Sequence, residues 1–187
     1  MLKYAAILLM SALPLAACNS SPTVEAKNAT VAEVAEKVDK AGGVDEFLRP
    51  GKWLNKATLV EFSAPGMPPG IADNMKAMMD KKPGTEQCMK AGDIRKPKTD
   101  FFAGNKNCRY DHFKMGDGVI DAKMRCAAGG QTQVITMAGD YHPDEYHMAM
   151  TTEMDRGASA PAGAMGSMTM KMRVDGKRIG ECDAKAS

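Results

Sequence analysis

Residues 107–126, NCRYDHFKMGDGVIDAKMRC, decide the fold because they are typical of two β-strands joined by a tight turn. Strand-like segments cover 107–115 and 119–126, where apolar and polar side chains alternate. Between them, Gly116-Asp117-Gly118 is a natural three-residue hairpin loop. The stretch therefore predicts an antiparallel hairpin in the middle of the chain.

The register of this hairpin predicts a disulfide. If Met115 faces Val119, Cys108 lies directly opposite Cys126 on the partner strand. The same register gathers apolar side chains on the cysteine face, namely Tyr110, Ile120, Ala122 and Met124. We therefore predict that Cys108 is bonded to Cys126 and that this face of the hairpin is buried.

The remaining cysteines follow from this pair. Setting Cys18 aside, four cysteines allow three connectivities. With Cys108 bonded to Cys126, elimination pairs Cys88 with Cys182 and ties the end of the chain to its middle. A zinc site of four thiolates is disfavoured because the sequence has no Cys-x-x-Cys pair.

The first residues have the pattern of a bacterial lipoprotein signal. Met1-Leu2-Lys3 is a short positive segment, and the uncharged run Tyr4–Leu15 is too short to span a bilayer. It ends at Leu15-Ala16-Ala17-Cys18, which resembles a lipobox, so we expect acylation of the Cys18 thiol and a stable anchor of more than one chain. Asn19 follows the cysteine where an aspartate is the usual inner-membrane retention signal. We therefore expect the protein to be located at the outer membrane, anchored in its inner leaflet and facing the periplasm.

The sequence divides into four parts. Thr30-Val31-Ala32-Glu33 is a capping box that starts a helix, which Gly42-Gly43 should stop. A second short helix is expected from Ile71, with Met75, Met78 and Met79 on the same face as Ile71. The expected organisation is a signal peptide at 1–17, the lipidated cysteine and a flexible tether at 18–29, an N-terminal helical segment at 30–49, and a disulfide-pinned β domain at 50–187.

Further hairpins follow the first one. Residues 131–141 and 146–154 flank a His-Pro-Asp-Glu turn, and 166–174 and 177–182 flank Asp175-Gly176, a strong hairpin signal. The predicted fold class is mainly β, an antiparallel meander of about six or seven strands, barrel-like or a sandwich, with two short helices.

Several short motifs together resemble a known family. They are Pro50-Gly51-Lys52-Trp53, Pro65-Gly66-Met67-Pro68, Gln87-Cys88, Asn107-Cys108 with Cys126, and Lys177-Arg178-Ile179-Gly180-Glu181-Cys182. From about Pro50 to Cys182 the chain resembles domain-of-unknown-function family 3617, a group of proteobacterial envelope proteins. Leu54 stands where members of that family usually carry an acidic residue. The resemblance implies the fold and an envelope address, and it implies no activity.

The charge of the chain excludes one class of partner. There are 25 Lys and Arg against 23 Asp and Glu, and no long basic run. Nucleic acid is therefore not an expected partner. The expected partners are the membrane, through Cys18, and an unidentified periplasmic protein or apolar ligand.

Methionine is the residue type that suggests a binding face. The chain has 17 methionines, and strand alternation places six of them on apolar faces, namely Met137, Met148, Met150, Met168, Met170 and Met172. These side chains can be packed core, ligands for a soft metal, or an adaptable surface for a lipid or peptide. Trp53 can likewise be a core anchor or a ligand-stacking residue at a barrel mouth.

A second candidate set lies at the end of one hairpin. His142 and His147 fall with Asp140 and Glu145 on the face opposite the methionines, where they can bind zinc or copper or form a solvated hairpin end. No catalytic signature is present, so we expect no enzyme and no cofactor. The expected function is a non-catalytic envelope lipoprotein with a binding or scaffolding domain. A copper-binding protein and a carrier of an apolar ligand or lipid are the alternatives.

Overall fold

The computed structural model describes residues 22–43, 47–90, 107–128, 131–155 and 167–183. Two helices are described, α1 (Val31–Lys40) and α2 (Ile71–Asp80). The strands of this part of the chain are β1 (Val24–Thr30), β2 (Gly51–Ser63), β3 (Thr85–Met89), β4 (Cys108–Gly116), β5 (Val119–Ala128), β6 (Gln131–His142), β7 (Glu145–Asp155) and β8 (Met168–Gly180).

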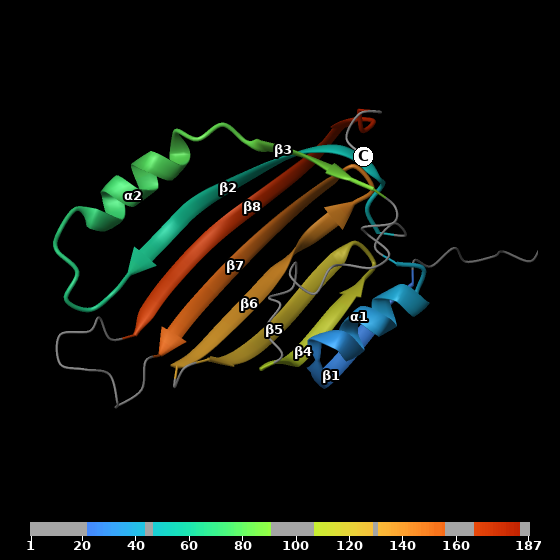
Figure 1. Cartoon of the computed structure of the whole chain (residues 1–187), viewed down its shortest axis with the longest axis horizontal. Helices are drawn as coiled ribbons and strands as arrows, with labels where there is room; N and C mark the ends of the chain where they lie inside the picture. Colours follow the sequence, from blue (N-terminus) through green and yellow to red (C-terminus); the bar gives the residue numbers. More distant parts are fainter. Residues whose placement is uncertain (1–21, 44–46, 91–106, 129–130, 156–166, 184–187) are drawn as a thin grey trace, which may run out of the picture.

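All eight described strands belong to one antiparallel sheet in the order β1-β4-β5-β6-β7-β8-β2-β3. The predicted meander is confirmed for β4 to β8, which are neighbours in chain order (Figure 1). The hairpin expected at Asp175-Gly176 is wrong, because β8 runs without a break from Met168 to Gly180 and pairs with β7 and β2 along its length. Because β1 and β3 are the two edges, the sheet stays open. The sequence left a barrel-like sheet or a sandwich open as alternatives. The structure instead has a single open, twisted sheet, with slightly more strands than the six or seven expected.

The β4–β5 hairpin contains the predicted cysteine pair with a shifted register near the turn. Gly116 rather than Met115 pairs with Val119, because the loop is the two-residue turn Asp117-Gly118. Both turn residues have positive φ, +52° and +75°, as in a type I′ turn. A bulge between Tyr110 and His112 absorbs the extra residue, so Cys108 still lies opposite Cys126.

The expected tether at 18–29 is wrong from Val24 onward. Residues Val24–Thr30 form β1, which pairs with β4 from Val24↔Met115 to Thr30↔Arg109. Val24, Ala26 and Ala29 are buried and belong to the main core. The apolar side chains of β1 are small and its alternation shifts at Asn28, whose φ is +48°, so the segment looks like a polar spacer in the sequence.

Helix α1 begins at the predicted capping box. The Thr30 hydroxyl accepts a hydrogen bond from the Glu33 backbone N–H at 3.2 Å, and the Thr30 N–H donates to the Glu33 carboxylate at 2.6 Å. These bonds lower the pKa of Glu33. Val34 and Val38 are buried in the same core as Cys108 and Cys126. The N-terminal segment and the β domain therefore share one hydrophobic core.

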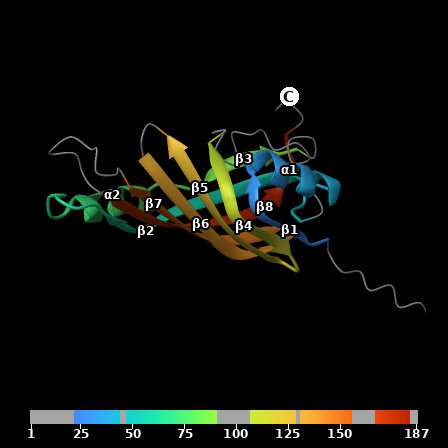
Figure 2. The same ribbon diagram turned by 90° about the horizontal axis from the view of Figure 1, so that it is seen from below.

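The two helices lie at opposite ends of the sheet. Figure 1 shows α1 beside β1 and β4 and α2 beside β2, and Figure 2 shows the same separation from below. In α2, Met75 and Met79 are half-buried, whereas Ile71 and Met78 are exposed. Two of the four residues expected on one face of α2 are therefore half-buried, and the other two are exposed to solvent. No described helix has the length and apolar character needed to cross a bilayer.

Candidate binding face

One row of side chains crosses seven of the described strands. Each member is the direct cross-strand partner of the next: Ala26, Phe113, Ala122, Met137, Met150, Met172 and Leu59. Direct partners on one face have Cβ atoms about 4.5–5.5 Å apart. The registers thus place three methionines of β6, β7 and β8 next to one another.

We call the six methionines of these strands the methionine face; they are Met137, Met148, Met150, Met168, Met170 and Met172. The central row is extended on either side, because Met148 pairs with Val174 and Met170 pairs with both Thr152 and Phe62. Met168 pairs with another methionine, Met154. The structure brings all six predicted methionines onto the same side of neighbouring strands.

Burial divides this side of the sheet into two halves. Helix α1 packs over β1 and β4, and both Phe113 on β4 and Ala122 on the neighbouring β5 are buried. On the methionine face only Met137 is buried, at 7% exposed, and the other five are half-buried. An apolar, uncharged strip therefore remains partly accessible to water beside a well-packed core.

Trp53 lies on the same side of the sheet but not at an opening. Its side chain is 0% exposed, and its indole N–H donates to the Arg49 carbonyl at 3.1 Å. The ring contacts Tyr146 at 5.8 Å between centroids, and the Tyr146 hydroxyl donates to Asn55 Oδ1 at 2.9 Å. Trp53 is a packing residue here and has no free face on which a ligand could stack.

Contacts around Trp53 hold three distant segments together. Arg49 donates its backbone N–H to the Pro143 carbonyl, and its guanidinium is 3.1 Å from Asp144. Arg178 donates its backbone N–H to the Asp144 carbonyl and its Nε to the Pro50 carbonyl, each at 2.8 Å. The β6–β7 turn is thus clamped between the start of β2 and the end of β8.

Gly51 is required at this junction. A Cβ atom there would lie 2.5 Å from both Arg178 Nε and the Gly180 carbonyl, and the φ of Gly51 is +145°. The nearby Cys88–Cys182 disulfide closes the same end, where β3 pairs with β2. The two disulfides of the structure, Cys88–Cys182 and Cys108–Cys126, are the pairs expected from the sequence.

The four candidate metal ligands at the hairpin end do not form a site. Asp140, His142, Glu145 and His147 are all exposed, on the side opposite the methionine face. His147 Nδ1 is 2.8 Å from Asp175 on β8, and this hydrogen bond, with smaller effects of Asp140 and Glu145, raises the pKa of His147. In the described ranges, no three His, Cys, Asp or Glu side chains are grouped as a metal would require.

The phenol hydroxyls of Tyr110 on β4 and Tyr146 on β7 offer no acid or base near neutral pH. Tyr110 is 1% exposed, and its hydroxyl has no hydrogen-bond partner among the described residues. Burial raises the pKa of Tyr110 to about 12 and also raises that of Tyr146. These phenols therefore stay protonated in the physiological range.

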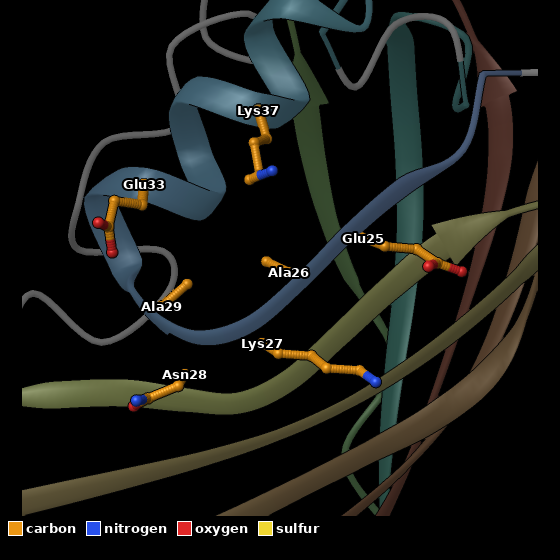
Figure 3. A pocket seen from close by; sticks show the side chains of 7 residues that line it. All are labelled: Glu25, Ala26, Lys27, Asn28, Ala29, Glu33 and Lys37. Carbon is orange, nitrogen blue, oxygen red and sulfur yellow. The ribbon is translucent and has the colours of Figure 1, made fainter.

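A hollow lies between α1 and β1, and it is open and lined by charged side chains. Lys37 points from the helix toward β1, above Ala26 and Ala29 (Figure 3). The other lining residues are Glu25, Lys27, Asn28 and Glu33. Glu33 is already bonded to Thr30, and the floor is the backbone of an edge strand. This hollow offers no converging set of free groups.

Residues 48–182 match the family described as "Protein of unknown function (DUF3617)". The chain belongs to this family. No curated protein and no solved structure matches the chain. The DUF3617 match covers β2 to β8 and leaves out β1 and α1, which nevertheless pack into the same core.

The structure explains several of the motifs by which the sequence resembles DUF3617 proteins. Pro50, Gly51 and Trp53 meet Arg178 at one end of the sheet, and Cys88 is bonded to Cys182 there. The hairpin cysteines lie in the main core. These motifs therefore maintain the fold, and they lie away from the central row of the methionine face.

Leu59, Phe62 and Thr152 also belong to this side of the sheet and were not expected there. Leu59 is 1% exposed and pairs with Met172, while Phe62 and Thr152 both pair with Met170. Strand β2 joins the sheet after β8, out of chain order, so no local pattern could reveal Leu59 and Phe62 as neighbours of β8.

Proposed function

We propose that this DUF3617 protein is a non-catalytic envelope lipoprotein, anchored at Cys18, whose methionine face binds an acyl chain of a lipid. The observation that carries the proposal is the continuous apolar strip on β6, β7 and β8, five of whose six methionines are half-buried. Flexible thioether side chains adapt to irregular apolar ligands and are favoured at promiscuous binding surfaces.

The position of the anchor supports a lipid as the ligand. Strand β1 begins at Val24, six residues after Cys18, so the sheet would lie close to the bilayer. The lipobox-like Leu15–Cys18 and the position of Asn19 favour the inner leaflet of the outer membrane, facing the periplasm. An acyl chain is then the apolar group at highest local concentration.

Native mass spectrometry tests this proposal on protein purified from its own envelope in mild detergent. We expect a retained lipid mass on the wild-type chain and its loss in Met148→Glu, because a carboxylate in the strip opposes binding of a hydrocarbon chain. Ala149→Glu is the matched control, since Ala149 is the next residue of β7 and is exposed on the opposite side. Wild-type protein that retains no lipid, or equal retention in both variants, would contradict the proposal. The mass of the intact chain also reports acylation of Cys18.

A further inference from the structure

The central row of the methionine face has the donor set of a soft-metal site. Met137 pairs directly with Met150, and Met150 pairs directly with Met172, so three thioethers lie on consecutive strands and on one side. Each side chain is long and unbranched, which lets sulfur atoms of adjacent strands turn toward one point. We infer that these three methionines bind one monovalent soft cation, Cu(I), through their sulfur atoms.

The surroundings of the row favour such an ion over a hard divalent one. The cross-strand neighbours of the three methionines are Ala122 and Leu59, and the flanking positions on β7 and β8 are Met148, Thr152, Met170 and Val174. None of these side chains is charged, so the oxygen ligands that Mg²⁺ or Ca²⁺ requires are missing from the row. Thioether sulfur selects Cu(I).

Burial is graded in a way that suits ion entry. Met137 is buried, while Met150 and Met172 are half-buried, so one of the three side chains is shielded and the other two are partly accessible to solvent. The four cysteines of the described residues are all in disulfides. Thioethers are therefore the available soft sulfur ligands in this part of the chain. The histidine candidates lie on the opposite side of the sheet and do not contribute.

Competition with a chromophoric Cu(I) chelator tests the site. The full chain carrying Cys18→Ser is used, so that the one cysteine outside the disulfides cannot bind the ion, and ascorbate keeps copper reduced. We expect one equivalent of Cu(I) per chain and at least a tenfold loss of affinity in Met150→Leu, a substitution that conserves volume. Met78→Leu is the matched control, because Met78 is 67% exposed on α2, outside the row, and should bind as the parent chain does.

A second measurement locates the ion independently of affinity. With methionine methyl groups labelled with ¹³C, Ag(I) serves as a redox-inert probe, and the methyl signals of Met137, Met150 and Met172 should shift together at one equivalent. Met124, buried on β5 beside Tyr110 and Ile135, should not shift. Absence of Cu(I) binding, unchanged affinity in Met150→Leu, or shifts confined to other methionines would each overturn the inference. Lipid retention is measured separately, so the two proposals can fail independently.

Discussion

The ring of Tyr146 occupies the space that a side chain on Gly176 would need. The two residues are direct partners on β7 and β8, and a Cβ atom on Gly176 would lie 2.1 Å from Tyr146 Cε1. The ring also contacts Trp53, and its hydroxyl donates to Asn55 Oδ1. An aromatic residue packed over a strand glycine is a known way of fixing strand register.

Gly176→Ala should therefore destabilise the protein. The added methyl group must displace Tyr146 and its bond to Asn55, which predicts a loss of about 1–3 kcal/mol in the free energy of unfolding. Urea unfolding followed by circular dichroism measures the loss. In a Tyr146→Leu background the same glycine substitution should have a much smaller effect, because the obstructing ring is gone. Equal losses in both backgrounds would contradict the contact.

Trp53→Phe should also lower stability, for a different reason. The phenyl ring keeps an apolar contact with Tyr146, but the Arg49 carbonyl loses the indole donor at 3.1 Å. Loss of this part-buried hydrogen bond should cost about 0.5–1.5 kcal/mol. Circular dichroism during urea unfolding reports the difference, since Trp53 is the single tryptophan and its fluorescence is lost with it. A change below about 0.5 kcal/mol would show that the N–H contributes little.

The two disulfides should differ in their resistance to reduction of the native protein. Cys108 and Cys126 are 2% and 4% exposed, whereas Cys88 and Cys182 are half-exposed near a sheet edge. A low concentration of a thiol reductant should open Cys88–Cys182 first, as alkylation and peptide mass mapping will show.

Opening that disulfide should then lower stability substantially. Cys88 and Cys182 are 94 residues apart, so the chain-entropy estimate of their contribution is about 4–5 kcal/mol. Urea unfolding of the partly reduced, alkylated protein measures it. Prior reduction of Cys108–Cys126 would contradict the order of accessibility.

His147 should titrate above the ordinary histidine range. Its hydrogen bond to Asp175 favours the imidazolium and raises the pKa, so the pair's stabilising effect is fully present below about pH 6.5 and is lost as the pH rises through the folded-state pKa. NMR titration of the His147 ring should show the raised pKa in the wild type and a lower one in Asp175→Asn. Asp140→Asn is the control and should lower it less. A His147 pKa that Asp175→Asn leaves unchanged would exclude this pairing.

Local patterns in the sequence predicted α1 and the β4–β5 hairpin, but the equally local signal Asp175-Gly176 was misleading, because it lies inside the continuous strand β8. The capping box placed α1, and the hairpin around Asp117-Gly118 paired Cys108 with Cys126 even though the predicted register near the turn was wrong by one residue. The bulge at Asp111 that restored the pairing has no signature in the residues themselves. The bulge is needed because the loop has two residues and not three. Gly116, in place of Met115, pairs with Val119, and one residue must be left unpaired before Cys108 can face Cys126.

Long-range placement explains what the sequence did not predict. Strand β1 has buried residues no larger than valine and alanine, and its partner β4 is about 80 residues away, so its pattern resembled a linker. The methionine alternation was readable within each strand, but the row from Met137 to Met172 depends on the registers of two strand pairs. The insertion of β2 beside β8 is a crossover that only the tertiary structure shows.

The early start of β1 also limits where this protein can act. If Cys18 carries lipid as proposed, the six residues from there to Val24 span at most about 20 Å when fully extended. The edge of the sheet formed by β1 would then stay within a short distance of the membrane surface, and the protein could not reach a partner across a wide aqueous gap. Encounters with membrane-bound molecules then occur by lateral diffusion in two dimensions, and a ligand must come to the bilayer to meet the sheet.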